Sequence, residues 1–277
     1  MAKKLRKKIS APGIGWAGIG GILLLLLATA AAVIFAHFYF STPTRPVLDA
    51  QTLCPVDGPK GMTVVLVDTS DDLPETTRRD TLRMLEDIIA SLPAYYKLDI
   101  RVLDIPGVRS RSLFSRCNPG DGEGLSEWTN NPRVERLRWL ESFRKPAAEA
   151  VKNSIAPAKA TSSPLMAAIQ DIAIDQFSSA ASQKATKSLI IVSDMIEYTK
   201  DYGQYRGDLT FERYKQSPAY LKFRTDLHGA SVLIRYVTRQ AKSGQPALDD
   251  AKHGEFWITW MKDNGASSVN VKRLQGT

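Results

Sequence analysis

Oxygen-bearing side chains follow two predicted buried strands at the point where each strand ends. Residues 62–67 read Met-Thr-Val-Val-Leu-Val and are followed by Asp-Thr-Ser-Asp-Asp at 68–72, and residues 188–193 are followed by Asp194. A third segment, Thr-Ser-Ser-Pro-Leu at 161–165, precedes a predicted helix. Hard divalent cations bind such oxygens, and Mg²⁺ takes six of them at about 2.0–2.1 Å. These residues indicate an ion site, although an Asp after a strand can instead do no more than cap the next helix.

Strands alternate with helices along most of the chain, and this order predicts how the oxygen ligands come together. Ligands of α/β sheets bind beyond the carboxyl ends of the strands. The alternation is typical of an α/β fold with a mostly parallel sheet flanked by helices. One segment, 108–115, is expected to return as an antiparallel edge strand after the Pro106-Gly107 turn. The predicted strands are 62–67, 98–105, 108–115, 188–193, 230–238 and 269–274, and the predicted helices are 74–92, 132–154, 164–181, 211–227 and 248–264.

The order of these segments resembles the A-type domain of von Willebrand factor and integrins. The shared pattern is a strand followed by Asp-x-Ser, a Ser-Pro-Leu that opens a helix, and a later strand followed by Asp, and it covers most of residues 61–277. The resemblance implies a Rossmann-like sheet with a metal-ion-dependent adhesion site, in which three loops hold Mg²⁺ or Mn²⁺ and a partner's carboxylate often completes the shell. By match, the ligands would be Asp68 and Ser70, then Ser163 with Thr161 as the alternate, and Asp194.

Three positions depart from the family pattern. Asp72 stands where the family has Ser, residues 159–160 (Lys-Ala) replace the usual glycines, and Met195 stands where Gly is common. Asp72 could bind a cation through its added charge, or it could belong to a site that has lost its ion. Both interpretations stay open, and Asp72 is kept among the candidate ligands.

The N-terminal region predicts a membrane anchor. Residues 14–36 are 23 residues without a charge, which at about 1.5 Å per residue exceed the ~30 Å hydrocarbon core. Five Lys and Arg residues and no acid lie in residues 1–12, so the N-terminus is expected in the cytoplasm of a single-pass inner (plasma) membrane protein. We expect a transmembrane helix within 13–40, a linker at 41–60, and a periplasmic or extracellular domain at 61–277.

A cleaved signal peptide is the alternative for this segment. Residues 28–32 (Ala-Thr-Ala-Ala-Ala) have the small-x-small form of a cleavage site. Apolar residues continue to Phe40, which suits an anchor better. In either case the folded domain lies outside the cytoplasm.

Charge and cysteine content narrow the functional classes. Five of the 37 basic residues lie in the first twelve positions, which leaves 32 against 29 acids and argues against a nucleic-acid partner. An exported domain with two cysteines favours a Cys54–Cys117 disulfide, with two buried free thiols as the alternative. The family topology would place both cysteines at the end of the sheet away from the ion.

Catalytic signatures are scarce. His228 and His253 lie near element ends and are expected at the surface or in capping roles, and Asp171 and Asp175 are expected to form a polar helical stripe. The main alternative to a binding module is a Mg-dependent phosphatase-like hydrolase. Such an enzyme would want Asp-x-Asp in the first loop, but residues 68–70 read Asp-Thr-Ser.

The segment after Asp194 is the predicted partner surface. It is expected at the same edge as the ion site, and it is rich in residue types that dominate binding hot spots, namely Tyr198, Tyr202, Tyr205 and Arg206. We therefore expect a non-enzymatic, membrane-anchored interaction module of an envelope assembly. Its protein partner is expected to bind at this edge, with or without a divalent ion, and an acidic residue of the partner is a candidate contact. A metal-free structural anchor is the remaining alternative.

Overall fold

The computed structural model describes residues 16–41, 45–70, 74–104, 109–125, 131–154, 161–205, 209–238 and 250–274. The chain divides into two compact units, Met1–Pro46 and Val47–Thr277. The first contains helix α1 (Trp16–Ser41), in which large apolar side chains such as Leu24 and Phe35 are exposed. Its 19-residue stretch Ile19–His37 could cross a membrane by length and composition, and a signal sequence would share these properties.

The second unit is built on one six-stranded sheet. The strand order is β3-β2-β1-β4-β5-β6, and every neighbouring pair is parallel except the antiparallel pair β2–β3. All six predicted strands are present, and the predicted antiparallel edge strand is confirmed. The sheet is mixed, mostly parallel and flanked by helices, as in a von Willebrand factor A fold. The strands are β1 (Gly61–Val67), β2 (Tyr96–Asp104), β3 (Arg109–Cys117), β4 (Thr186–Ser193), β5 (Ser231–Tyr236) and β6 (Ser268–Arg273).

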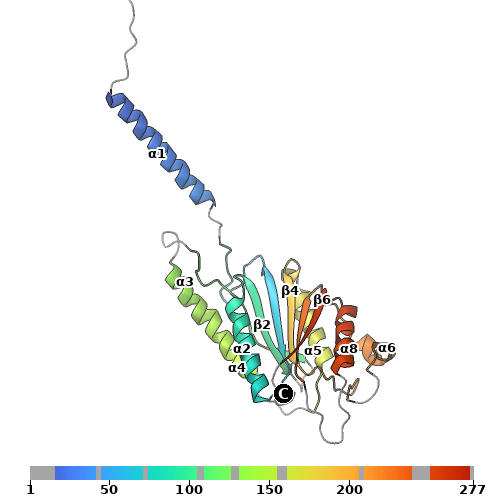
Figure 1. Ribbon diagram of the computed structural model, residues 1–277. Coiled ribbons are helices and arrows are strands. Elements are labelled where there is room, and N and C mark those ends of the chain that lie inside the picture. The colour runs from blue at the N-terminus through green and yellow to red at the C-terminus, as the bar shows by residue number, and fades with distance from the viewer. Residues whose placement is uncertain are drawn as a thin grey trace, which may run out of the picture. The chain divides into compact units, whose positions relative to one another are not determined.

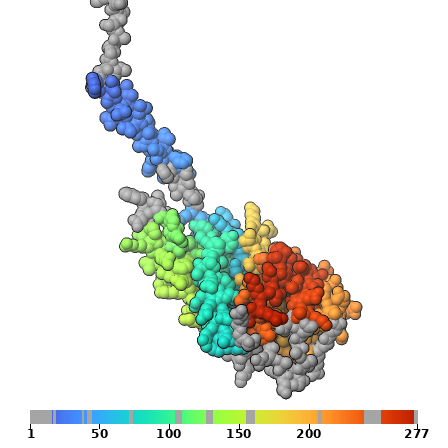
Figure 2. All heavy atoms as spheres, viewed as in Figure 1, coloured from blue at the N-terminus to red at the C-terminus, as the bar shows by residue number. Residues whose placement is uncertain are grey.

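Helices cover both faces of the sheet (Figure 1). One face carries α2 (Glu75–Ser91), α3 (Pro132–Trp139), the π-helical η1 (Leu140–Arg144) and α4 (Lys145–Ser154). The other face carries α5 (Leu165–Ile172), the π-helical η2 (Ala173–Phe177), α6 (Phe211–Lys215), α7 (Pro218–Lys222) and α8 (Asp250–Asp263), and a short 3₁₀ turn, η3 (Ala180–Ser182), follows η2. In Figure 2, α2 and the α3–α4 segment lie side by side on the surface of the folded unit.

Two cores result from this arrangement because side chains alternate across a strand. In β1, Val65 and Val67 pack beneath α2 and α4, whereas Val64 and Leu66 pack beneath α5 and α8. Both faces of β1 are therefore apolar, which explains why its sequence reads as a continuous hydrophobic run rather than as an alternating one.

Pro146 explains the π-helical turn before α4. A proline has no N–H to donate to the carbonyl four residues earlier and clashes with it in a regular helix. The chain widens instead, so that the Lys145 N–H donates to the Leu140 carbonyl. The Ser142 carbonyl, which loses its helical donor, accepts a hydrogen bond from Arg116 Nη1 at 2.8 Å. The predicted helix of residues 132–154 is thus continuous but locally expanded.

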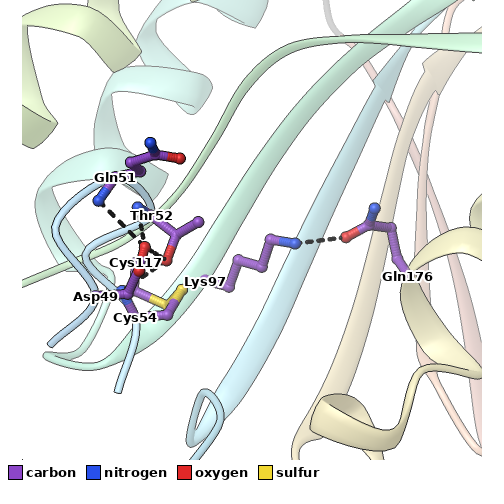
Figure 3. The surroundings of a disulfide bond; sticks show 7 residues. All are labelled: Asp49, Gln51, Thr52, Cys54, Lys97, Cys117 and Gln176. Carbon is purple, nitrogen blue, oxygen red and sulfur yellow. Dashed lines mark hydrogen bonds between the residues drawn. A yellow bond between two sulfur atoms is a disulfide. The ribbon is translucent and has the colours of Figure 1, made fainter. Parts of the chain in front are cut away.

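The segment before β1 lies in the same compact unit as the sheet. The folded unit begins at Val47, so residues 47–60 of the predicted linker belong to it. Cys54 and Cys117 form the predicted disulfide (Figure 3), and the Cys117 N–H donates to the Thr52 carbonyl at 2.8 Å. Cys117 pairs with Lys97 at the start of β2, so the disulfide lies at the end of the sheet opposite the carboxyl ends of the parallel strands, as expected.

Candidate functional site

Three loops meet at the carboxylate of Asp68, directly after β1. Its Oδ1 accepts a hydrogen bond from the Ser70 N–H at 2.9 Å. Its Oδ2 accepts from the hydroxyls of Ser193 at 2.6 Å and Ser163 at 3.4 Å. The side chain is 6% exposed. Parallel strands end at the same edge, which is why residues 95 and 125 positions apart in the chain can reach one carboxylate.

The second loop supplies Ser163 rather than Thr161. Ser163 is buried and reaches Asp68, whereas Thr161 is exposed. Ser163 is held by a two-way backbone pairing with Tyr198: the Ser163 N–H donates to the Tyr198 carbonyl at 2.8 Å, and the reverse bond measures 3.0 Å. The second and third loops are therefore joined directly beside the candidate ligands.

The third loop turns sharply after β4. Asp194 is 6% exposed and its Oδ1 accepts the Ile196 N–H at 3.0 Å. Met195 has a φ of +62°, a left-handed conformation that costs least for glycine, which accounts for the family preference at this position. The Met195 side chain is fully buried in the core that contains α5 and α8, and its carbonyl accepts Trp257 Nε1 at 2.7 Å.

Ser193 is a site residue that the sequence reasoning missed. Its hydroxyl donates to Asp68 and accepts the Met195 N–H at 2.7 Å, so it joins the first loop to the third. The available signal was a polar residue at the last position of an otherwise apolar strand, next to a candidate ligand.

The donor set matches a hard divalent cation in type. Asp68, Ser70, Ser163 and Asp194 offer only oxygen, and each is less than 10% exposed. No ion pair joins Asp68 to a cation within the described ranges, and no group of three His, Cys, Asp or Glu residues arranged for a metal occurs there. Asp72 lies outside the described residues. A buried carboxylate needs neutralisation, so the chemistry at Asp68 suits a cation, and the metal assignment remains a prediction.

A fully buried carboxyl group, Glu197, lies beneath this edge. Its Oε2 accepts the N–H of Met166, in the first turn of α5, at 2.8 Å. Burial raises the pKa of Glu197 to about 8, although the bond from Met166 opposes the shift and the charge of Asp68 adds to it. Glu197 is therefore largely protonated at neutral pH, which limits the negative charge gathered at the loop edge.

His253 continues this buried network, and its predicted surface or capping role is wrong. The ring is 0% exposed, with Nδ1 2.9 Å from the Tyr236 hydroxyl and Nε2 3.0 Å from Gln204 Oε1. The same Gln204 oxygen accepts the Glu197 N–H at 2.9 Å. Burial lowers the pKa of His253 to about 4, so the ring is neutral at pH 7 and ties α8 to the third loop.

The predicted partner residues separate into two groups. Tyr198 is 47% and Tyr205 36% exposed, and their rings form an edge-to-face pair with centroids 5.1 Å apart. Tyr202 instead turns inward and packs against Tyr214 and Phe256, with ring centroids 5.0 and 6.1 Å away. Arg206 lies outside the described residues. The Tyr198–Ser163 pairing puts the exposed tyrosines at the loop edge, as expected.

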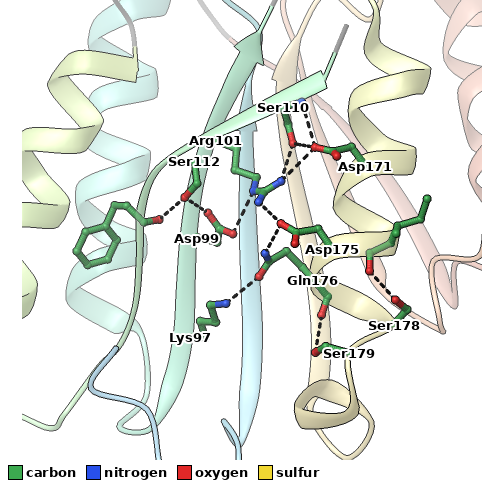
Figure 4. A network of polar contacts seen from close by, with 12 residues as sticks. Lys97, Asp99, Arg101, Ser110, Ser112, Asp171, Asp175, Gln176, Ser178 and Ser179 are labelled. Carbon is green, nitrogen blue, oxygen red and sulfur yellow. Dashed lines mark hydrogen bonds and ion pairs between the residues drawn. The ribbon is translucent and has the colours of Figure 1, made fainter. Parts of the chain in front are cut away.

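A second group of acids surrounds Arg101, on β2 (Figure 4). Arg101 Nε lies 3.1 Å from Asp99, Nη1 lies 3.4 Å from Asp171, and Nη2 contacts Asp175. The expectation that Asp171 and Asp175 form only a solvated stripe on their helix is therefore wrong. They tie α5 and η2 to the β2–β3 edge of the sheet.

Comparison with known proteins gives structural neighbours alone. No family model and no curated protein matches the sequence. Solved structures with similar folds include a von Willebrand factor type A protein from Catenulispora acidiphila (13% identity, TM-score 0.42, 79% of this chain and 39% of that chain). Others are an aerotolerance-related membrane protein from Bacteroides fragilis (12%, 0.34, 76% and 92%) and the SpRpn10 VWA domain (11%, 0.38, 78% and 90%). The strand order and directions define the fold.

Proposed function

We propose that this von Willebrand factor A-like chain is a membrane-anchored interaction module that binds a protein partner at the loop edge around Asp68. The observation that carries the proposal is the convergence of three loops on Asp68 beside the exposed Tyr198–Tyr205 pair. Rigidly paired loops with exposed aromatic rings suit recognition, because ordered tyrosines lose little entropy on binding.

The proposed location is the outer side of an inner (plasma) membrane, as a subunit of an envelope assembly. The apolar stretch Ile19–His37 is long enough to span, and the basic residues of positions 1–12 precede it. By the positive-inside bias the folded unit is then exported. The Cys54–Cys117 disulfide supports this location, since disulfides persist in oxidising compartments.

A divalent ion would be held by Asp68, Ser70, Ser163 and Asp194, with Asp72 as a further candidate. The ion would supply positive charge for a carboxylate of the partner. Hydrolysis is the weaker alternative, because residues 68–70 read Asp-Thr-Ser and lack the second acid that a phosphatase of this kind would want in the first loop.

Thermal unfolding of the full chain in detergent micelles, with Mg²⁺ and Mn²⁺ titrated, tests whether a divalent ion binds at Asp68. A ligand at about 100 times its Kd that binds only the folded state adds about 2.7 kcal/mol. We expect this gain in the wild type and in Asp57→Ala, which alters an exposed acid, and its loss in Asp68→Ala. If the ions change the stability of all three proteins by the same amount, no ion binds at Asp68, and the loop edge would recognise its partner without a metal.

Photo-crosslinking tests the interaction itself. A photoreactive amino acid replaces Tyr198 in the full chain expressed in cells, and a matched variant carries it at Val56, which is 71% exposed. We expect a discrete adduct at position 198 that is absent at position 56. Adducts at both positions or at neither would contradict a partner at the loop edge and favour a structural anchor.

A further inference from the structure

A groove of about 510 Å³ lies beside the loop edge. One wall is the hairpin of residues 199–203, which is closed by the Thr199 N–H donating to the Tyr202 carbonyl at 2.9 Å. The other wall comes from α6 and the turn before α7, with Arg213, Gln216 and Ser217. An ion pair of 2.5 Å between Asp201 of the hairpin and Lys222 of α7 joins the two walls.

The groove carries an excess of positive charge. Among the described residues that line the groove, Asp201 is the single acid, and it is neutralised by Lys222. Lys200 and Arg213 also line it, and in the described part of the chain neither forms an ion pair. Both side chains are exposed. Two cations on opposite walls, with the amide of Gln216 and the hydroxyl of Ser217 on the same wall as Arg213, favour an anionic ligand that can accept several hydrogen bonds.

The exposed tyrosine pair flanks the hairpin that forms one wall of the groove, because Tyr198 directly precedes residues 199–203 and Tyr205 follows them. Tyr198 pairs with Gly203 across the hairpin and with Ser163 on its other side. Tyr202, in the groove wall, packs on the core residues Tyr214 and Phe256, so this wall is anchored to the folded unit. A ligand lying in the groove can therefore also reach the aromatic rings of Tyr198 and Tyr205 by extending along one hairpin.

We propose that this groove binds an acidic, aromatic-containing peptide segment of the partner, with carboxylates on Lys200 and Arg213 and an apolar side chain on the Tyr198–Tyr205 pair. This inference rests on the proposed function and names the chemistry of its partner. The carboxylates bind the protein's own cations, so their binding needs no ion at Asp68.

Fluorescence anisotropy with the full chain in micelles tests the groove. The probes are two fluorescein-labelled peptides of equal length, Gly-Asp-Phe-Asp-Gly and its amide counterpart Gly-Asn-Phe-Asn-Gly. We expect the acidic peptide to bind about tenfold more tightly, because hydrogen bonds to charged groups are the stronger ones. The preference should disappear in the double variant Lys200→Ala/Arg213→Ala. It should persist in Arg83→Ala, which removes an exposed cation on α2, on the opposite face of the sheet.

Repeating the titration with EDTA and with Asp68→Ala separates the groove from the ion site. If the acidic peptide binds equally well with EDTA and to Asp68→Ala, the groove is supported as its binding site. If binding is lost in both measurements, the groove proposal is overturned and the peptide carboxylate binds at the ion, which leaves the proposed function standing. Equal affinity for the two peptides, or no binding while the Tyr198 crosslink still forms, would also overturn the groove alone.

Discussion

Two groups of three carboxyl side chains lie in the same folded unit and are neutralised in opposite ways. The Arg101 cluster consists of Asp99, Asp171 and Asp175 around one guanidinium. The loop-edge cluster consists of Asp68, Asp194 and Glu197, in which hydroxyls and backbone amides surround Asp68 and burial raises the pKa of Glu197.

The difference separates a structural cluster from the proposed binding edge. A carboxylate that is already paired with arginine has little left to offer a ligand, and its contacts join elements of the fold. A buried carboxylate held only by neutral donors keeps its demand for a cation. Acid-rich sequence alone does not distinguish these cases, since both clusters follow from ordinary Asp and Glu positions on strands, helices and loops.

Removing the central cation of the Arg101 cluster should produce the largest effect. Arg101→Met keeps most of the buried stem but leaves the fully buried Asp99 without its cationic partner and with only the Ser112 hydroxyl as a side-chain donor. We expect about 3–5 kcal/mol of destabilisation, as for other broken buried pairs. Urea unfolding of the full chain in micelles measures it, with Arg83→Met as the exposed control. A decrease in the free energy of unfolding no larger than that of a typical surface substitution would show that the cluster is not structural.

Glu197→Gln should change how stability depends on pH. The folded pKa of about 8 lies above the unfolded value of 4.5, so the folded state binds more protons between these limits and loses stability as pH rises through them. From pH 6.5 to 8, the wild type should lose up to about 1.4 kcal/mol per pH unit relative to the variant. The difference in unfolding free energy between the two proteins isolates this group from others that titrate in the same window.

The titration of His253 is the reason for comparing the two proteins between pH 6.5 and 8. Its folded pKa of about 4 lies below the unfolded value of 6.5, so its neutral form contributes stability that is lost as pH falls through this range. Between pH 4.5 and 6.5 the two groups oppose each other, and the contribution of His253 fades as pH rises above 6.5, where that of Glu197 continues to change. A difference between wild type and Glu197→Gln that stays constant from pH 6.5 to 8 would contradict the buried, protonated carboxyl group.

Asp175→Asn should have the smallest effect. Asp175 contacts Arg101, but its side chain is 53% exposed, and exposed pairs contribute about 0–1 kcal/mol. The same urea measurement should therefore show a loss well below that of Arg101→Met. A comparable loss would mean that the outer acid, rather than buried Asp99, holds the arginine in place.

Much of the fold was predictable because its signals are local. The apolar runs at 62–67 and 188–193 became β1 and β4, and the turn at 106–107 correctly separated an antiparallel pair. The Ser-Pro-Leu segment identified Ser163, whose hydroxyl reaches Asp68. The bounds of the folded unit were less predictable, because residues 47–60 have no periodic pattern and are held by the disulfide and backbone bonds.

Polar partnerships over long sequence distances were not predictable. Arg101 meets Asp171 and Asp175 across 70 and 74 positions, and His253 meets Gln204 across 49. A histidine near the start of a helix looks the same in sequence whether it faces solvent or the core. Its neutrality here follows from burial, which only the packing of α8 determines.

The sequence by itself determined the alternation of strands and helices, the apolar span near the N-terminus, and the three loops that carry candidate ion ligands. Period and residue type are enough for this, because strands and helices repeat over a few residues. The tertiary structure decided which acids are paired with arginine, which carboxyl group is protonated, and which tyrosines remain exposed. Those properties depend on burial and on neighbours that are distant in the chain, and neither exists until the two faces of the sheet are covered.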